Sequence, residues 1–232
     1  MEKKENKDKK MNDFGYHVQV DKNHYSPKKY VTIQRWSTHY RVVKEVLNIG
    51  PNSILEIGPG NGLVTCILKK IGFNVKTLDF DSDLEPDYVI DIANNSLGNL
   101  GETFDLVIAS QVLEHIRYSS FLKVMKNLSK MTNQVLLTLP DTNRRSKFLF
   151  LITNKFYFAR KIVYFKRAKH IFEGQHYWEI GKKGYPLKRI KNDLMNCNWS
   201  IKKNYLNFEN PYHRLLLLAN KNHPHARVIP YK

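Results

Sequence analysis

Apolar residues follow two different spacings between residue 30 and residue 140. From Tyr30 to Ile49 they recur every three or four positions, which predicts an amphipathic helix that Gly50-Pro51 ends. Short apolar runs then alternate with further helical segments. Strands are expected at Ser53–Ile57, Asn74–Leu78, Tyr88–Ile90, Leu106–Ala109 and Gln134–Leu139, and helices at Leu63–Ile71 and Phe121–Met131. This alternation predicts an α/β fold with a doubly wound, mostly parallel sheet.

The pattern changes after Pro140. Lys147–Ile171 is basic and aromatic with a helical spacing, and Gly184–Cys197 predicts another helix. Two β-rich runs, Trp199–Phe208 and His213–Ala219, follow and are joined by a turn that contains proline. We therefore expect seven strands in one sheet, an antiparallel last strand and a helical insertion after the fifth strand.

The 232 residues are expected to hold one elaborated domain. Residues 1–13 are polar and Lys-rich, which predicts a disordered tail. The domain then covers residues 14–232. It is divided into a core at 30–140, a basic aromatic insertion or lid at 141–191 and a closing hairpin at 192–232.

The positive charge of the chain is unevenly distributed. The net charge is +17, from 38 Lys and Arg against 21 Asp and Glu. Residues 144–191 carry 14 Lys or Arg against 2 acidic residues, whereas residues 51–143 carry 7 against 11. This division favours a catalytic core with a basic attachment over a uniform nucleic-acid coat.

Composition excludes several classes of protein. A hydrophobic share of 42% rules out wholesale disorder. Two cysteines, Cys66 and Cys197, cannot build a disulfide framework or a four-ligand zinc site. No apolar run reaches the roughly 18 residues that a spanning helix needs, and the N-terminus lacks the apolar stretch of a secretory signal. We expect a cytoplasmic protein, with contact at the inner face of a membrane as an alternative.

The most specific chemical signal follows the first strand, where Gly58, Gly60 and Gly62 occupy alternate positions. A turn without Cβ atoms lets the backbone approach a ligand closely, although it can also be a simple strand–helix turn. Asp79 ends the next strand, where a carboxylate can bind both hydroxyls of a ribose. Leu63 stands where a dinucleotide fingerprint has its last glycine, and no phosphate-binding loop follows. The site suits a ligand with a ribose and an adenine but no phosphate.

Ordered motifs across the core extend this signal. They are Glu56–Gly62, Leu78–Asp81, Pro86–Asp91, Phe104–Val107 and Val112–Ile116. In order and spacing they resemble class I S-adenosylmethionine-dependent methyltransferases of the type-11 domain group. The resemblance implies a Rossmann-like methyltransferase fold with a reversed last strand, and S-adenosyl-L-methionine as the cofactor.

The resemblance also assigns roles to the residues of the glycine turn and the next strand. Gly58 and Gly60 would lie against the methionine part of the cofactor, and Gly62 would open the following helix. Glu56 would lie near the amino end of that methionine. Asp79 would hold the ribose hydroxyls.

The later motifs would complete the cofactor site. Asp91 and the backbone of Ile92 would bind the adenine edge, and Ser110 and Gln111 would line the site beside the sulfonium. Glu114-His115 usually supports the cofactor pocket in this family, with catalysis as the alternative. All these positions fall at the carboxyl ends of parallel strands, where such sheets bind ligands.

A run of acidic residues raises the question of a metal site. Asp81, Asp83, Glu85 and Asp87 follow Asp79 closely. Their spacing lacks the glycine and the terminal glutamate of a calcium-binding loop. We therefore expect a solvated acidic turn and no bound metal.

One segment outside the core stands out as a candidate for the acceptor side. Gln175–Gly181 combines a histidine, two aromatic residues and a carboxylate. His176 could act as a general base, with Glu179 orienting it or binding the acceptor. The alternative is a loop that caps the pocket, with Trp178 in the packing and Glu179 at a helix start. The sequence does not decide between the two.

The basic segment 144–191 has three interpretations. It could be a lid over the active site, a surface that lies on an anionic membrane, or an RNA-binding face on which bases stack. Nothing in it matches an RNA-recognition module. We favour the lid, then the membrane surface.

The expected function is methyl transfer from S-adenosylmethionine to an oxygen or nitrogen of a small-molecule or lipid- or glycan-linked acceptor. An anionic acceptor would suit the charge. Two alternatives remain open. One is an RNA methyltransferase that uses the basic segment, and the other is a nicotinamide-dependent oxidoreductase or a non-catalytic cofactor-binding scaffold.

Overall fold

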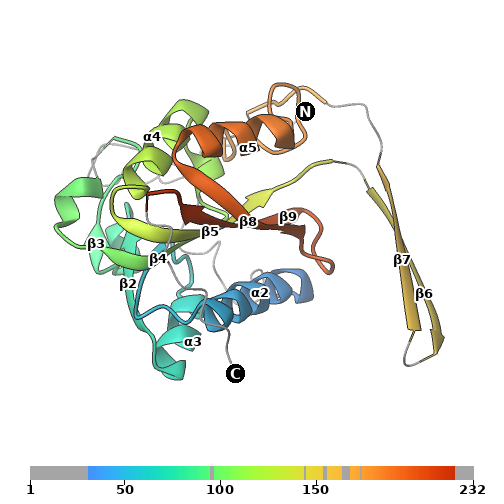
Figure 1. Ribbon diagram of the computed structural model, residues 1–232, viewed down its shortest axis with the longest axis horizontal. Coiled ribbons are helices and arrows are strands. Elements are labelled where there is room, and N and C mark those ends of the chain that lie inside the picture. The colour runs from blue at the N-terminus through green and yellow to red at the C-terminus, as the bar shows by residue number, and fades with distance from the viewer. Residues whose placement is uncertain are drawn as a thin grey trace, which may run out of the picture.

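The fold is a mixed β-sheet covered by helices on both faces (Figure 1). This computed structural model describes residues 31–94, 97–143, 145–153, 156–163, 168–172 and 174–222. The strands of the large sheet are β1 (Ser53–Ile57), β2 (Asn74–Asp79), β3 (Tyr88–Val89), β4 (Phe104–Ser110), β5 (Thr132–Pro140), β8 (Trp199–Leu206) and β9 (His213–Asn220). The helices are α2 (Ile33–Ile49), α3 (Leu63–Ile71), α4 (Tyr118–Leu128) and α5 (Leu187–Asn196), with short 3₁₀ turns η2 (Ser82–Leu84), η3 (Leu97–Leu100) and η4 (Leu113–His115).

The seven strands of this sheet pair in the order β3-β2-β1-β4-β5-β9-β8. Strands β1 to β5 pair in parallel with one another. Strand β9 is antiparallel to both β5 and β8, so β9 is the reversed strand of the sheet. The predicted α/β class, the seven strands and the antiparallel last strand are confirmed.

Two apolar cores fill the spaces between the sheet and its helices. On β4, Leu106 and Ile108 belong to the core that includes α2 and α3, whereas Val107 and Ala109 belong to the core that includes α4 and α5. Alternate residues of a strand point to opposite faces, so one continuous apolar run supplies both cores. Because the central strands are buried on both faces, a ligand can reach them only at their ends.

Helix α2 begins after Thr32, whose Oγ1 accepts a hydrogen bond from the Arg35 N–H at 3.3 Å, and it ends at Gly50, where φ is +61°. The spacing of apolar residues predicted this helix correctly, but not which face of its first half is buried. The exposed apolar residues in that half are Ile33, Trp36 and Tyr40.

The insertion after β5 differs from the prediction. The basic aromatic segment was expected to be helical, but β6 (Arg145–Thr153) and β7 (Phe156–Val163) form an antiparallel hairpin. Aromatic and β-branched residues favour extended backbone, and cross-strand pairing satisfies its N–H and C=O groups. Figure 1 shows the hairpin standing away from the sheet and its helices. The helix predicted at Gly184–Cys197 is confirmed as α5.

Two remaining expectations concern the N-terminal tail and the absence of a membrane-spanning helix. The tail predicted at residues 1–13 lies outside the described residues. Within the part of the chain that the structure describes, no helix has both the length and the apolar character to cross a membrane.

Candidate functional site

The turn after β1 brings backbone, not side chains, to the carboxyl edge of the sheet. Gly58, Gly60 and Gly62 all have left-handed backbone, with φ of +68°, +58° and +68°. The Gly58 N–H donates to the Leu78 carbonyl at 2.8 Å, which ties the turn to β2. A Cβ on Gly58 would lie 2.3 Å from Cγ2 of Val112. Glycine is therefore required at position 58 by both its φ angle and its neighbour.

Glu56 lies just before this turn and is 3% exposed. Its carboxyl group accepts a hydrogen bond from the Thr65 hydroxyl of α3. Burial raises the pKa of Glu56 to about 7, although the hydrogen bonds from Thr65 oppose the rise. Glu56 is thus a buried carboxyl group that an adjacent cation, such as an amino group, would help to ionise.

Asp79 ends β2 and is 9% exposed. Its Oδ1 accepts a hydrogen bond from the Asp81 N–H at 3.0 Å. Burial raises the pKa of Asp79 to about 6, against the hydrogen bonds that it receives from the backbone. A carboxylate that has lost most of its water gains from two hydroxyl donors, as the cis-diol of a ribose would supply.

Asp91 and Ile92 follow β3. The carboxylate of Asp91 accepts hydrogen bonds from the Ala93 N–H at 2.8 Å and from the Asn94 side-chain amide at 2.8 Å. Ile92 packs against the apolar core that includes α4 and α5. These bonds hold Asp91 in a local turn, and each of its oxygens can accept a further hydrogen bond.

Ser110 and Gln111 stand at the carboxyl end of β4, next to the end of β5. The Ser110 hydroxyl lies 2.8 Å from the Thr138 hydroxyl, and the Gln111 amide donates to the same oxygen at 3.3 Å. Gln111 has φ of +59°, which is uncommon for a residue with a Cβ. The Gln111 N–H bonds the Thr138 carbonyl at 3.0 Å, so pairing to β5 holds this backbone in place.

A second group of polar side chains gathers around Glu179. Its Oε1 lies 2.7 Å from His176 Nδ1 and accepts a hydrogen bond from the Tyr212 hydroxyl at 2.7 Å. Burial alone would raise the pKa of Glu179, but the hydrogen bonds from His176 and Tyr212 lower it. For His176 burial alone would lower the pKa, and the bond to Glu179 raises it. The arrangement resembles the histidine–carboxylate pairs that catalyse proton transfer.

Backbone hydrogen bonds fix the segment that carries His176 against the end of the sheet. The Tyr177 N–H donates to the Glu114 carbonyl at 2.8 Å, and the Ile180 N–H donates to the Pro140 carbonyl at 3.0 Å. Trp178 is fully buried, and the centroid of its ring lies 4.7 Å from that of Phe121 of α4 at a tilt of 44°. His176 is thereby held beside the carboxyl ends of β4 and β5.

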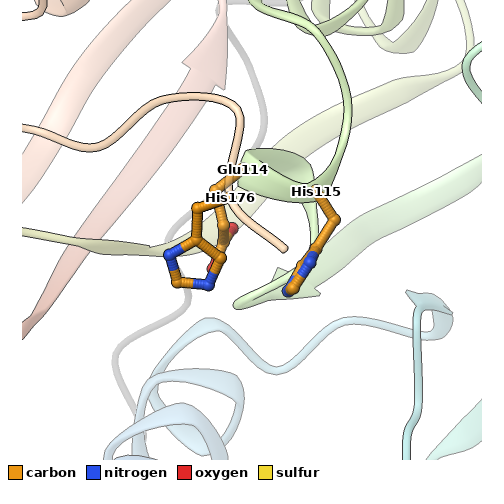
Figure 2. A group of neighbouring side chains, drawn as sticks. All are labelled: Glu114, His115 and His176. Atoms are coloured by element: carbon orange, nitrogen blue, oxygen red, sulfur yellow. The ribbon is translucent and has the colours of Figure 1, made fainter. Parts of the chain in front are cut away.

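Glu114 and His115 complete the cluster (Figure 2). Glu114 is 0% exposed, and burial raises the pKa of its carboxyl group to about 7. The rings of His115 and His176 meet edge to face, with centroids 4.9 Å apart. One donor atom from each of Glu114, His115 and His176 lies within 4.8 Å of the others.

The structure combines parts of both interpretations of residues 175–181. Trp178 is packing, as the capping-loop interpretation requires. Glu179 does not start a helix, and its carboxylate turns to His176, as the base interpretation requires. Tyr212, in the turn between β8 and β9, was missed, because no sequence pattern connects that turn with residue 176.

Comparison with known sequences identifies the family. A sequence profile for a methyltransferase domain matches residues 33–183, which is more than half of the chain. The chain belongs to this methyltransferase-domain family. It is a class I methyltransferase with S-adenosylmethionine as its cofactor, as the motifs indicated. The family decides against the nicotinamide-dependent oxidoreductase and the non-catalytic scaffold. No curated protein sequence matches the chain.

Solved structures of other methyltransferases share the fold. An S-adenosylmethionine-dependent methyltransferase from Clostridium acetobutylicum ATCC 824 has a TM-score of 0.55 at 12% identity, over 85% of this chain and 96% of that chain. Magnesium protoporphyrin IX methyltransferase from Synechocystis PCC 6803 has a TM-score of 0.52 at 16% identity, over 83% of each chain. The 1,6-didemethyltoxoflavin-N1-methyltransferase of Burkholderia thailandensis has a TM-score of 0.52 at 12% identity, over 80% of this chain and 79% of that chain.

The residues of the methyltransferase fit its cofactor. The left-handed glycines present bare backbone at the end of β1, where a Cβ on Gly58 would meet Val112. Asp79 presents a buried carboxylate at the end of the adjacent strand. A bare turn beside a buried carboxylate, without a phosphate-binding loop, suits an adenosyl group that carries no phosphate.

Proposed function

We propose that this methyltransferase methylates an oxygen or nitrogen of a small acceptor, either free or linked to a lipid or glycan, with His176 as the general base. The observation that carries the proposal is the hydrogen bond of 2.7 Å between His176 Nδ1 and Glu179 Oε1. An ionised carboxylate can only accept, so Nδ1 holds the proton and Nε2 keeps its lone pair. Among the described residues none hydrogen-bonds to Nε2 of His176.

The same residues that the resemblance named are proposed to hold the cofactor. Their shared feature is that they lie at or just after the carboxyl ends of β1 to β4. They are Glu56, Gly58, Gly60, Gly62, Asp79, Asp91, Ile92, Ser110 and Gln111. Ser110 and Gln111 lie nearest in the chain to Glu114 and its cluster, so the reactive end of the cofactor belongs on that side.

The chain contributes position and a proton acceptor. When bound, S-adenosylmethionine supplies an electrophilic methyl group on a sulfonium. The acceptor O–H or N–H donates to Nε2 of His176, which takes the proton as the acceptor becomes methylated. Glu179 stabilises the imidazolium that forms, and the Tyr212 hydroxyl holds Glu179 in place at 2.7 Å.

The structural relatives support a small or glycan-type acceptor. By their names, three of them methylate a glycopeptide, magnesium protoporphyrin IX and 1,6-didemethyltoxoflavin. These acceptors differ widely in chemistry, so the fold does not select among them. The net charge of +17 favours an anionic acceptor.

The hairpin of β6 and β7 favours an acceptor that is linked to a lipid. In its register Lys147 faces Lys161, and the next pairs toward the turn include Leu149 with Ala159, Phe150 with Phe158 and Leu151 with Tyr157. Phe148 pairs with Arg160 next to these cations, whereas the three pairs from Leu149 to Leu151 contain only apolar or aromatic residue types. Apolar pairs beyond a pair of cations are typical of a segment that enters the interface of an anionic membrane. This contact takes the place of the lid expected from the sequence.

Isotope-labelled S-adenosylmethionine tests the acceptor class. Purified protein is incubated with polar metabolites, lipid extract and total RNA from the source cell, and the labelled product is located. We expect label in the lipid or polar fraction, and loss of labelling in His176→Asn with unchanged cofactor affinity. Label confined to RNA would overturn the proposal.

Vesicles of mixed anionic and neutral lipid test the hairpin. The full chain should float with vesicles that contain about 30% anionic lipid and stay behind with neutral ones, because each cation near the surface adds about 1 kcal/mol. A Phe150→Ser/Phe158→Ser double variant should lose flotation and keep its activity on soluble acceptor. Equal behaviour of the two proteins would contradict membrane contact.

A further inference from the structure

Glu114 carries a carboxyl group that is fully buried. It is 0% exposed, and among the residues that the structure describes neither of its carboxylate oxygens has a hydrogen-bond partner. A buried polar group of this kind destabilises the folded protein, and more so when it is charged. The proposed general base and its carboxylate explain His176 and Glu179 but leave Glu114 without a role.

Two imidazole rings face this carboxylate. Glu114 and His115 come from η4, directly after β4, and His176 comes from the loop before α5 (Figure 2). The donor atoms of the three residues lie within 4.8 Å of one another. His176 is 22% exposed at its side chain, so a small solute can reach the cluster from its side. One carboxylate and two imidazoles are the donor set that first-row divalent metals prefer.

The surroundings of His176 match those of a metal-binding histidine. Such a histidine commonly donates its second ring N–H to a carboxylate, which fixes its tautomer and its orientation. In this structure Glu179 Oε1 lies 2.7 Å from Nδ1 of His176, and the Tyr212 hydroxyl holds that oxygen. The lone pair of Nε2 is then available to an ion.

We propose that Glu114, His115 and His176 bind a divalent transition-metal ion, such as zinc, beside the methyl-transfer site. The proposal rests on the proposed function in one respect, because Nε2 of His176 serves as the base in the ion-free protein and as a ligand in the loaded one. Around a tetrahedral zinc the donors lie about 3.4 Å apart, so binding draws donor atoms that now lie within 4.8 Å of one another closer by up to about 1.4 Å. Magnesium and calcium prefer oxygen ligands and fit the two imidazoles poorly.

The ion gives the site a defined chemical task. Three protein ligands leave a fourth position that an acceptor oxygen can occupy. An oxygen bound there has its hydroxyl pKa lowered, and the proton leaves to solvent without help from His176. The loaded enzyme would therefore favour hydroxyl acceptors, and the ion-free enzyme would depend on the imidazole. Glu114 and His115 would take part in acceptor activation only when the ion is bound.

Metal titration of the full chain tests the site without any reaction. All titrations use a background in which His223 and His225 are replaced by Asn, because a His-Pro-His sequence binds such ions by itself. Calorimetry with Zn²⁺ should give one site per chain. Co²⁺ should give the visible absorption of a four- or five-coordinate site, and Mg²⁺ should give little heat.

Two ligand variants and a matched control decide the assignment. Glu114→Gln and His115→Asn should each weaken Zn²⁺ binding by about a hundredfold or more, and Glu179→Gln by about 10–100-fold. Glu102→Gln removes a carboxylate that pairs with Lys76 on the surface and should leave binding unchanged. Thermal unfolding of the ion-free variants shows whether each has folded.

The results separate this proposal from the proposed function. Unchanged Zn²⁺ affinity in folded Glu114→Gln and His115→Asn would overturn the metal site, whatever the methyltransferase activity. Loss of activity in His176→Asn with no Zn²⁺ binding in the parent would leave His176 as a base alone. If Glu114→Gln abolishes Zn²⁺ binding and the parent is active without the ion, both the metal site and the general base are supported.

Discussion

The cofactor side and the acceptor side of this methyltransferase are built in different ways. The proposed cofactor side lies mainly on the first β-α-β crossover, where the Gly58 N–H donates to the Leu78 carbonyl and Asp79 follows directly, and it is completed at the ends of β3 and β4. The acceptor side is assembled from η4, the loop before α5 and the turn between β8 and β9. The comparison teaches that cofactor binding is a local property of the fold, whereas acceptor activation depends on late segments docking onto it.

This difference makes the two sides separable by mutation. A change on the acceptor side should spare cofactor affinity, because its residues reach the cofactor side only through the ends of β4 and β5. A change in the first crossover should weaken cofactor affinity and leave the His176 cluster assembled. The predictions below break or sharpen that separation.

The largest effect is expected for His176→Asn. The proposed base supplies roughly 10²–10⁴-fold in rate, and kcat should fall by that factor. The dissociation constant of S-adenosylmethionine, measured by calorimetry, should stay within about twofold, because no contact with the first crossover is lost. The control is His170→Asn, since His170 hydrogen-bonds the backbone carbonyl of His176, at 2.9 Å, and not its imidazole. Equal losses in the two variants would assign the effect to the loop, not to the imidazole.

The next largest effect is expected for Gly58→Ala. The φ angle of +68° costs a residue with a Cβ about 1–2 kcal/mol, and the Cβ would in addition lie 2.3 Å from Val112. Cofactor affinity should fall by more than tenfold, and the unfolding temperature should drop.

Gly50→Ala is the matched control for this change. Gly50 has a similar φ of +61° but no atom within 4 Å of its Cβ position, and it lies at the end of α2. It should lose only the conformational cost and keep cofactor affinity. A Gly58→Ala protein with normal affinity would show that the turn does not approach the cofactor.

The sequence predicts the proposed cofactor side better than the proposed acceptor side. The glycine turn, Asp79 and the alternation of strands and helices are predictable because each depends on a short stretch of chain with a repeating pattern. His176 and Glu179 are three residues apart, so their pairing could be suggested but not decided. Tyr212 could not be found, because only the antiparallel docking of β9 on β5 brings its turn to Glu179.

The prediction of a helical insertion after β5 was wrong for a different reason. Short basic and aromatic runs fit a helical spacing and a strand spacing about equally well over a few residues. Cross-strand pairing over β6 and β7 decides for the hairpin, and pairing is a property of two segments together. No single window of the sequence contains that information.

A smaller effect with a recognisable pH signature is expected for Asp79→Asn. Cofactor affinity should fall by about 10–100-fold at pH 7.5, as for a lost charge-assisted hydrogen bond. Because the pKa of Asp79 in the ligand-free protein is raised to about 6, affinity in the parent should also fall as the pH drops through 6. The variant should lack this dependence.

The stability of the Asp79→Asn protein should change in the opposite direction. A carboxyl group whose pKa rises from 3.8 to about 6 on folding binds its proton more tightly in the folded state. Its ionisation therefore destabilises the ligand-free parent progressively between pH 4 and pH 6, by about 3 kcal/mol at the upper end. Denaturant unfolding at pH 7.5 should find the variant more stable than the parent, and an equally stable variant would place Asp79 in water.

The smallest effect is expected for Tyr212→Phe, and it tests whether the late turn acts on chemistry. The change removes a hydroxyl that donates to Glu179 Oε1 at 2.7 Å and leaves the ring that packs near His213 at 5.7 Å. One hydrogen bond to a charged group is worth about 1.5–3 kcal/mol, but Glu179 keeps its bond to His176. We therefore expect kcat to fall by about three- to tenfold, with the cofactor dissociation constant unchanged.

A double variant tests whether Tyr212 acts through Glu179. Because the Tyr212 hydroxyl serves to hold the Glu179 carboxylate, Tyr212→Phe/Glu179→Gln should lose little more activity than Glu179→Gln alone. Additive losses would mean that Tyr212 acts on the acceptor directly and not through the carboxylate.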